Sequence, residues 1–361
     1  MLRYLISFAY QNPLATSASE TTSIGNKTEL FPIVDPAVDG PDCNKDCADC
    51  TINFPPRFKV NAGRELYGSV KPFVKHVLVA TGKADWAPMA ESEAGSLMAA
   101  FAWGWFKPKK GKMMVSASNL SIDAERNNSA INGNQGQGQG QDQGLQQENA
   151  TTVLILPSFT FVDKVTPSRI PEFMERFIDS SPDPDVETQQ DQDQTGPSPP
   201  PPSSSKAEGQ AEAEAGTEAE RHGQIPHPAH PSQHTLTTRP CPRDYIILLC
   251  SHNRRDARCG ISAPLIRREL ERHLRPLGLH RDEDDTRPGG VGILYVSHVG
   301  GHKFAANVLI YRREAEQMIW LARVRPADCE AIVKQTVLKG KVVHVDQLRG
   351  GFDVKRGVAS W

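Results

Sequence analysis

The chain has 361 residues, a formal net charge of −2 at pH 7 and seven cysteines. Its length allows two domains, and seven cysteines in a chain of this size are too few for a disulfide-held scaffold. No apolar run approaches the ~20 residues of a membrane-spanning helix, so we expect no membrane span. The residues from 241 onward are basic. Their Lys and Arg are scattered and no base-stacking motif accompanies them, so we expect no nucleic-acid partner.

Three segments are predicted to be disordered, beginning with residues 1–40. Residues 118–150 contain NQGQGQGQDQG, and residues 179–240 are acidic and rich in Pro, Ser and Gln. Such stretches lack the apolar side chains that offset the entropy cost of ordering a chain. We expect residues 118–150 to be an insertion in an N-terminal α/β domain of residues 41–178. Residues 179–240 are then a linker to a C-terminal domain of residues 241–361.

The N-terminal block is predicted to contain a strand, a helix, two strands and a second helix. Apolar runs and helical apolar spacing place these elements at His76–Thr81, Met89–Trp103, Thr152–Leu156, Phe159–Val165 and Ile170–Ile178. The Gln- and Gly-rich insertion falls between the first helix and the second strand, where a longer loop costs little closure entropy.

The C-terminal block shows a similar order more clearly. Strands are predicted at Tyr245–Leu249 and Val291–Ser297, a hairpin at Asn307–Tyr311 and Met318–Val324, and helices at Ser262–Leu274 and Pro326–Leu338. This order is close to that of a thioredoxin-like α/β layer. The N-terminal block looks like a looser version of it, which suggests a degenerate structural repeat.

Two cysteines and two histidines supply a complete set of four metal ligands. Cys250 and Cys259 have the spacing C-x8-C, and His298 and His302 follow as H-x3-H, with both pairs on loops beside predicted strands. The set could hold zinc or a two-iron cluster. Structural zinc usually takes cysteines two to four residues apart, whereas a wider, charged loop can surround a larger group. A Rieske centre differs too, because there each loop supplies one Cys and one His.

The mixed ligand set has a consequence for redox chemistry. Two thiolates and two neutral imidazoles leave an oxidised two-iron cluster uncharged, whereas four thiolates would leave it negative. Adding an electron is then easier, so we expect a reduction potential above that of all-cysteine ferredoxins. If the imidazoles keep a solvent-reachable N–H, electron uptake is coupled to proton uptake.

Several ordered motifs resemble one known family. They are LLCSHNRRDARCGISAPLI, SHVGGHKFAANVLIY, IWLARVRPADCEAIV, HVLVATGKADW and CNKDCADCTINFP. Together they resemble the sucrase/ferredoxin-like family, in its fungal branch of the altered-inheritance-of-mitochondria type. The resemblance implies a thioredoxin-like ferredoxin domain with a [2Fe–2S] cluster. The family's two Cys and two His ligands carry over onto Cys250, Cys259, His298 and His302.

Residues next to these ligands are expected to tune them. Arg254, Arg255, Arg258 and Lys303 would favour the reduced, more negative state and the docking of a redox partner protein, whose identity the sequence does not reveal. His252 is expected to hydrogen-bond behind the ligands rather than to bind metal itself.

Three further cysteines, Cys43, Cys47 and Cys50, form C-x3-C-x2-C. The C-x-x-C at its end could be a thiol–disulfide couple or part of a second metal site, so these are possible redox thiols. Cys329 falls in a predicted helix and is expected to be a packing residue.

The two ends of the sequence indicate different compartments. The first nineteen residues contain one Arg and no acid, which weakly resembles a mitochondrial presequence. The final Ala-Ser-Trp resembles the tryptophan tail by which clients recruit the cytosolic iron–sulfur targeting complex, which makes Trp361 a possible targeting signal. We expect a mitochondrial location, with a cytoplasmic one as the alternative.

The leading hypothesis is an electron-transfer protein with a bis-Cys, bis-His [2Fe–2S] cluster, a redox carrier rather than an enzyme with its own small-molecule substrate. One alternative is a thiol–disulfide enzyme or sensor acting through Cys47 and Cys50. Another is an interaction module stabilised by zinc. No Walker loop, dinucleotide fingerprint or nucleophile elbow follows a predicted strand.

Overall fold

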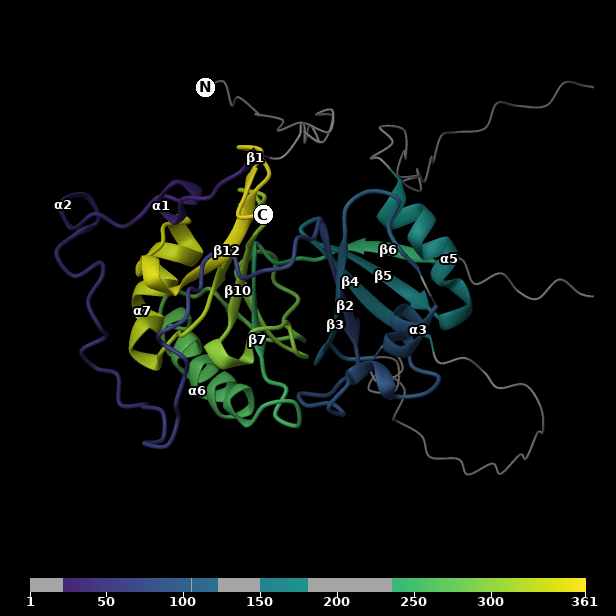
Figure 1. Cartoon of the computed structure of the whole chain (residues 1–361), viewed down its shortest axis with the longest axis horizontal. Helices are drawn as coiled ribbons and strands as arrows, with labels where there is room; N and C mark the ends of the chain where they lie inside the picture. The colour runs from purple at the N-terminus through teal and green to yellow at the C-terminus, as the bar shows by residue number, and fades with distance from the viewer. Residues whose placement is uncertain (1–21, 105, 123–149, 181–235) are drawn as a thin grey trace, which may run out of the picture. The chain divides into compact units, whose positions relative to one another are not determined.

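The computed structural model describes residues 22–104, 106–122, 150–180 and 236–361 (Figure 1). The predicted presequence and most of the predicted insertion and linker lie outside the described residues. Within the described part, helices pack on one mixed sheet of 13 strands, which confirms the predicted α/β class.

The C-terminal half contains the predicted thioredoxin-like layer. Strand β7 (Tyr245–Cys250) lies parallel to β9 (Val291–Val296) and antiparallel to β10 (Val308–Arg312), and β10 forms the predicted hairpin with β11 (Gln317–Leu321). Helix α6 (Ala257–Leu274) connects the two parallel strands. The four strands therefore lie in the order β9-β7-β10-β11. Strands β7 and β9 with helix α6 form a βαβ unit, and the β10–β11 hairpin lies beside β7.

The N-terminal half repeats this topology. Strand β2 (Lys75–Ala80) lies parallel to β3 (Met113–Ser118) and antiparallel to β4 (Thr151–Leu156), which pairs with β5 (Thr160–Val165). Helix α3 (Leu97–Trp103) connects β2 to β3. The order β3-β2-β4-β5 therefore matches β9-β7-β10-β11, so the suggested structural repeat is confirmed at the level of topology.

Strand β3 is an element that the sequence did not predict. Its sequence MMVSAS contains a single β-branched residue, so its strand signal is weak. The predicted insertion of residues 118–150 consequently lies between two strands rather than between a helix and a strand. Ser118 ends β3, and residues 119–122 are described beyond it.

Strand β3 also joins the two halves. Ser118 pairs with Val296 of β9, and the Ala117 N–H donates to Ser297 Oγ at 3.0 Å. Both halves thus share one continuous sheet, although the predicted division into domains at residues 178 and 241 stays a prediction.

Residues 22–40 are ordered, in contrast to the disorder predicted for the first 40 residues. Strand β1 (Thr22–Ser23) pairs with β13 (Val358–Ala359), and helices α1 (Lys27–Leu30) and α2 (Pro36–Asp39) follow. Leu30 and Phe31 are buried in the core that α6 covers. Burial of these two large apolar side chains offsets the entropy cost of ordering the segment. Because most residues around Leu30 and Phe31 are polar, the sequence alone did not predict that these two side chains are buried.

The chain after α2 runs along the C-terminal half, although residues 41–178 were predicted to form the N-terminal domain. Backbone N–H groups of Cys47, Asn61 and Gly68 donate to the carbonyls of Ala327, Lys303 and Arg349, respectively. In Figure 1 this segment passes close to the helices α6 and α7 (Cys329–Ala331). The segment therefore belongs, by its contacts, to the same half of the sheet as the four candidate ligands.

The last four residues of the predicted linker form strand β6 (Thr237–Pro240), which pairs with β5. Side-chain contacts of Arg239 with β5 explain why this polar segment pairs with that strand. Its guanidinium carbon lies 4.0 Å from the centre of the Phe161 ring, and its Nε lies 3.0 Å from Asp163 Oδ2.

The remaining elements are short. They are the 3-10 turns Ala90–Ser92, Pro167–Arg169, His302–Phe304, Pro326–Asp328 and Val345–Gln347, helix α5 (Ile170–Phe173), the π-helical turns Met174–Asp179 and Ile332–Val337, and strands β8 (His280–Arg281) and β12 (Leu348–Asp353). The full sheet order is β1-β13-β12-β11-β10-β7-β9-β3-β2-β4-β5-β6, with β8 beside β9. The predicted helix at Met89–Trp103 begins only after Ser96, because Gly95 adopts a left-handed φ of 74°.

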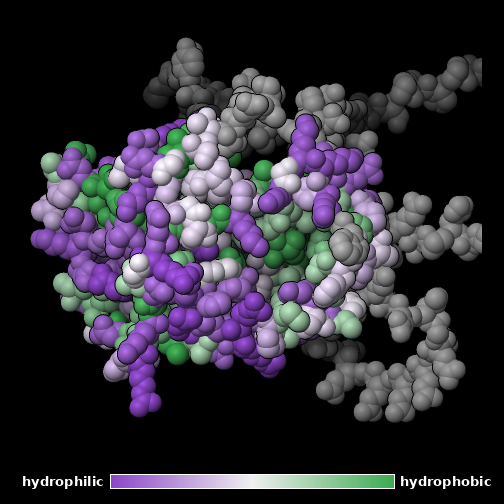
Figure 2. Space-filling view, viewed as in Figure 1, coloured by the Kyte–Doolittle hydropathy of each residue, from purple (hydrophilic) through white to green (hydrophobic). Residues whose placement is uncertain are grey.

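None of the helices in the described part of the chain has the length and apolar character needed to span a membrane. In Figure 2 the hydrophobic patches of the viewed face are separated by hydrophilic side chains. The large exposed apolar residues are spread along the described chain, namely Val38, Val74, Met89, Trp103, Ile261, Leu277 and Val354.

Candidate metal centre

The two predicted thiol ligands are brought together at the end of β7 and the start of α6. Cys250 lies on the strand face of Ile246 and Leu248 and is 2% exposed, and Cys259 is fully buried. The predicted helix start at Ser262 is wrong, because α6 begins at Ala257 and Asp256 caps it by accepting from the Arg258 N–H at 3.0 Å. Cys259 is therefore in the first helical turn rather than on the preceding loop.

The two thiols shift each other's pKa in opposite directions. A hydrogen bond with Cys259 holds the pKa of Cys250 well below its ordinary value, and His298 lowers it further, against the effect of burial. The same hydrogen bond, together with burial, raises the pKa of Cys259. The first proton therefore leaves this pair more readily than the second, and a nearby positive group would favour loss of the second.

The two predicted imidazole ligands face each other across a tight loop. His298 follows β9, and His302 begins a 3-10 turn. Gly300 and Gly301 have φ values of 84° and 68°, a left-handed conformation that favours glycine. This turn places the ring centres 5.0 Å apart, with His302 Nδ1 at 3.5 Å from His298 Nε2.

The donor set fits a bound metal group. His298 Nδ1 is buried and has no hydrogen-bond partner among the described residues, which is costly for a polar atom unless a ligand satisfies it. In the described part of the chain, no three of the four donors lie within 4.8 Å of one another. One tetrahedral zinc ion, with bonds of about 2.0–2.3 Å, would hold all four closer than that. These four residues therefore form no preorganised single-ion site in the described chain.

His252 lies behind the candidate donor His298. It is 1% exposed; its Nε2 lies 2.7 Å from the Ala87 carbonyl oxygen, and its Nδ1 accepts from the His298 backbone N–H at 3.1 Å. Because both ring nitrogens have partners, His252 positions His298 and is not available as a fifth ligand. Its ring also packs edge-on against Trp86, at 5.7 Å between centres.

The loop after β2 covers the cysteine loop. Ser251 Oγ donates to the Ala84 carbonyl at 2.6 Å, and the Arg254 N–H donates to Asp85 Oδ1 at 3.1 Å. This contact places the predicted N-terminal block directly against the candidate site.

Arg349 is a buried cation that the sequence analysis missed. It is 4% exposed and donates to the Gly300 carbonyl at 2.9 Å and to Asn307 Oδ1 at 3.0 Å. Burial lowers its pKa to about 10, while the nearby charge of Cys250 raises it. A Cβ on Gly301 would meet the guanidinium at 2.6 Å, so glycine is required there. No local motif marks Arg349, because it lies 47 positions after His302.

Asp256 is a second neighbour that the sequence did not single out. Its Oδ2 lies 3.8 Å from His302 Nε2. Burial lowers the pKa of His302, and the charge of Asp256 opposes that shift. Arg258 pairs with Asp256 at 2.7 Å, which lowers the pKa of the carboxyl group.

The other predicted basic neighbours face outward or pack on aromatic rings. Arg254 is 67% exposed in its side chain, and Arg255 donates to the Pro88 carbonyl at 3.1 Å. Lys303 Nζ lies 4.9 Å from the centre of the Phe304 ring. These side chains contribute charge around the site without touching the four donors.

The predicted redox thiols lie apart from the four candidate donors, with Cys47 and Cys50 near the end of α6 and Cys43 beside α7. Cys43 packs with Val34, Ala331 and Val343, and Cys329 is fully buried, as expected of a packing residue. Burial and the neighbouring Glu269 raise the pKa of Cys50 to about 12, so this thiol is protonated at neutral pH. Cys47 Sγ lies 3.1 Å from Arg272 Nη2.

Trp361 is packed on the fold. Its ring stacks on Phe73 at 5.3 Å between centres and meets Phe352 edge-on at 5.9 Å. The preceding Ser360 accepts from the Gly351 N–H at 3.0 Å. Its predicted targeting role would require the indole to leave this contact.

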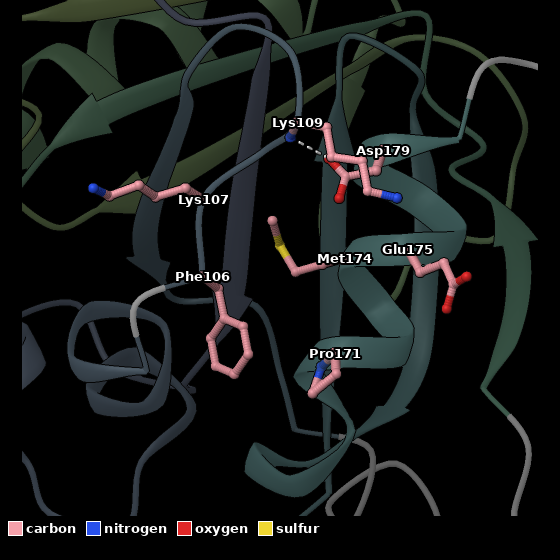
Figure 3. A pocket seen from close by; sticks show the side chains of 7 residues that line it. All are labelled: Phe106, Lys107, Lys109, Pro171, Met174, Glu175 and Asp179. Carbon is pink, nitrogen blue, oxygen red and sulfur yellow. Dashed lines mark hydrogen bonds between the residues drawn. The ribbon is translucent and has the colours of Figure 1, made fainter.

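A cavity of about 450 Å³ lies beside α5, far in sequence from the candidate centre (Figure 3). Met174 points into it from the helix, Lys107 and Glu175 lie at its rim, and the Lys109 N–H donates to Asp179 Oδ1 at 2.6 Å. Its charged lining residues are Lys107, Lys109, Glu175 and Asp179, and none of the four candidate donors lies in it.

The comparisons place the chain in a known family. The model of the sucrase/ferredoxin-like family matches residues 66–350, so the chain belongs to that family. Actin patches distal protein 1 of Saccharomyces cerevisiae is 48% identical over 92 residues, which are 26% of this chain and 29% of that protein. Altered inheritance of mitochondria protein 32 of Clavispora lusitaniae is 36% identical over 118 residues, 33% of this chain and 39% of the relative.

The same-named protein of Meyerozyma guilliermondii is 35% identical over 107 residues, 30% of this chain and 34% of that protein. Each match thus spans under two fifths of the relative's length. No solved structure matches the chain. The family is ferredoxin-like, and the described residues include Cys and His groups that could hold metal.

Proposed function

We propose that this chain is an electron carrier whose Cys250, Cys259, His298 and His302 hold a [2Fe–2S] cluster. When bound, such a cluster supplies one-electron transfer at a potential that mixed Cys and His ligation raises. The observation that carries the proposal is the convergence of two thiols and two imidazoles, with His298 Nδ1 buried and unpartnered.

The surrounding residues hold the donors in place. His252 anchors the backbone of His298, and Arg349 anchors the loop at Gly300. Rigid ligands limit rearrangement on electron uptake and keep water from buried thiols. A cation beside the thiolates also favours the extra negative charge of the reduced state.

His302 is the proposed proton site. Its side chain is 40% exposed, and its Nε2 lies near Asp256 Oδ2. A proton can therefore be held at Nε2, between the carboxylate and solvent, when negative charge builds up nearby. Reduction should then be coupled to proton uptake, and the potential should fall as pH rises.

The proposed compartment rests on the names of the relatives, and the proposed partner rests on charged residues near the centre. The relatives' name, altered inheritance of mitochondria, supports a mitochondrial location, with the cytoplasm as the alternative. A redox partner protein is required to supply or accept the electron. Arg254 and Arg255, next to the centre, suit an acidic docking surface on that partner.

The first test is spectroscopic. The full chain, purified without oxygen, should be red-brown and give an S = 1/2 electron paramagnetic resonance signal after reduction with dithionite. Its potential should fall as pH rises. A colourless protein with stoichiometric zinc at these four residues would overturn the proposal in favour of a zinc-stabilised module.

Ligand identity is tested by His302→Cys, paired with His302→Ser. The cysteine variant replaces a neutral ligand with a thiolate, so the potential should drop and its pH dependence should weaken. The serine variant should lose the cluster. A cysteine variant with the potential of the unchanged chain would exclude His302 as a ligand.

A further inference from the structure

A second donor cluster lies near the C-terminal end of α6. Cys47 Sγ, a ring nitrogen of His273 and a carboxylate oxygen of Glu330 lie within 4.8 Å of one another. Cys47 is 9% exposed, and the side chains of His273 and Glu330 are 13% and 33% exposed. The three donors are thus partly shielded but remain reachable from solvent.

Two of the three donors, Cys47 and His273, face one cation. Arg272 Nη2 is 3.1 Å from Cys47 Sγ and 3.2 Å from His273 Nε2. A guanidinium has no acceptor, so the His273 nitrogen that faces it offers a lone pair. Arg272 is held at its other side by Glu269, with Nε 2.9 Å from the carboxylate.

We propose that Cys47, His273 and Glu330 form a zinc(II) site. One thiolate, one imidazole and one carboxylate are all ligands of zinc, and three protein ligands leave a fourth position for water. Arg272 would turn aside on binding and keep its contact with Glu269. The site is separate from the cluster ligands and goes beyond the proposed electron transfer.

Zinc here would connect three distant parts of the chain. Cys47 belongs to the N-terminal segment, His273 to the end of α6 and Glu330 to α7. At present the loop of Cys47 is held by its N–H to the Ala327 carbonyl at 2.9 Å and by the ion pair of Asp46 with Arg325. Metal binding would therefore stabilise the folded chain and fix this loop.

A neighbouring group of Asp46, Asp328 and His344 does not support a second such proposal. Arg325 contacts both carboxylates, at 2.8 Å and 2.5 Å, and this group offers no thiolate. In the proposed site Glu330 is also ion-paired, with Lys334 at 2.6 Å, so zinc would have to displace that pair, while the Cys47 thiolate supplies the stronger ligand.

The test uses the full chain carrying Cys250→Ser and Cys259→Ser, so that cluster ligands cannot contribute. Zinc(II) is titrated against a chromophoric chelator, and cobalt(II) is used to detect the thiolate-to-metal absorption band. We expect one zinc per chain and a cobalt band that Cys47→Ser abolishes. Loss of a mere partner behind a ligand already costs 10–100-fold in affinity, and loss of a ligand costs at least as much. Glu330→Gln, a change at a half-exposed position, should therefore weaken zinc binding by about tenfold or more.

Two controls make the result specific. Cys43→Ala, in the packing cluster nearby, should leave zinc affinity unchanged. Arg272→Ala removes the competing cation and should tighten zinc binding. No stoichiometric zinc in the parent, or unchanged affinity in Cys47→Ser, would overturn the proposal. So would an Arg272→Ala variant that binds zinc more weakly, because Arg272 would then support a thiolate rather than compete with a metal. Since the parent lacks the cluster ligands, none of these outcomes depends on the electron-transfer proposal.

Discussion

His252 Nδ1 accepts a hydrogen bond from the backbone N–H of His298, at 3.1 Å, while Nε2 of the same ring lies 2.7 Å from the Ala87 carbonyl oxygen. One buried imidazole thereby connects the loop after β2 to the loop that carries a proposed ligand. The N-terminal half thus supports the centre without supplying a ligand to it.

Replacing His252 with Phe should loosen the centre. The His298 N–H would lose its acceptor, and an unpaired buried polar group costs about 1–3 kcal/mol. We expect a lower free energy of unfolding in urea and faster loss of the visible absorption in a chelator chase. Arg254→Ala, at an exposed position of the same loop, is the control and should change neither. A His252→Phe protein as stable as the parent would show that this hydrogen bond does not position His298.

Asp256→Asn should move the pH dependence of the potential. Asparagine still caps α6, but the charge that raises the pKa of His302 is lost, so burial lowers that pKa further. A group with a lower pKa releases its proton at lower pH, so the range in which the potential falls with pH should shift to lower pH. Redox titrations between about pH 5 and pH 9 measure this. Asp85→Asn, on the covering loop, should have no such effect; an unshifted profile in Asp256→Asn would exclude His302 Nε2 as the proton site.

Arg349→Lys should destabilise both the fold and the centre. Lysine cannot reach the Gly300 carbonyl, Asn307 Oδ1 and the Ser69 carbonyl together, and loss of hydrogen bonds to a buried charge costs about 2 kcal/mol. The cluster should also be lost faster. Arg323→Lys is the matched control, because it loses bonds to the Asn61 and Arg64 carbonyls instead. Equal cluster lifetimes in the two variants would mean that Arg349 has no specific role at the site.

Deletion of Trp361 separates targeting from packing. If the residue is a recruitment signal, its deletion should lower cluster occupancy in cells while chemical reconstitution stays normal. Phe73→Ala removes the stacking partner but keeps Trp361, so it should lower the midpoint of thermal unfolding and spare recruitment. If both variants lose occupancy in proportion to their stability, the indole acts only by packing.

Most of the strands around the centre could be predicted from the sequence. Apolar runs such as YIILL and VGILYV are long and rich in β-branched residues, and a strand buried on both faces requires that composition. The same local reasoning failed for β3 and β6, because their sequences MMVSAS and TTRP have few of the apolar β-branched residues that indicate a strand. Both strands form because a neighbouring strand supplies hydrogen bonds, which a local pattern does not record.

In the candidate site too, the sequence indicated some residues and only the structure revealed others. Cys250, Cys259, His298 and His302 stand out because their types and spacing are rare outside metal sites, and their assignment stays a prediction. The sequence by itself determined the α/β class, the order of the main strands and this set of donors, because periodicity and spacing are local properties. Only the tertiary structure decided that Asp256 faces His302, that Arg349 holds Gly300 and that Cys47 meets His273. Of these, the contacts of Arg349 and Cys47 join residues 49 and 226 positions apart, and all three depend on how the chain packs rather than on any repeating pattern within it.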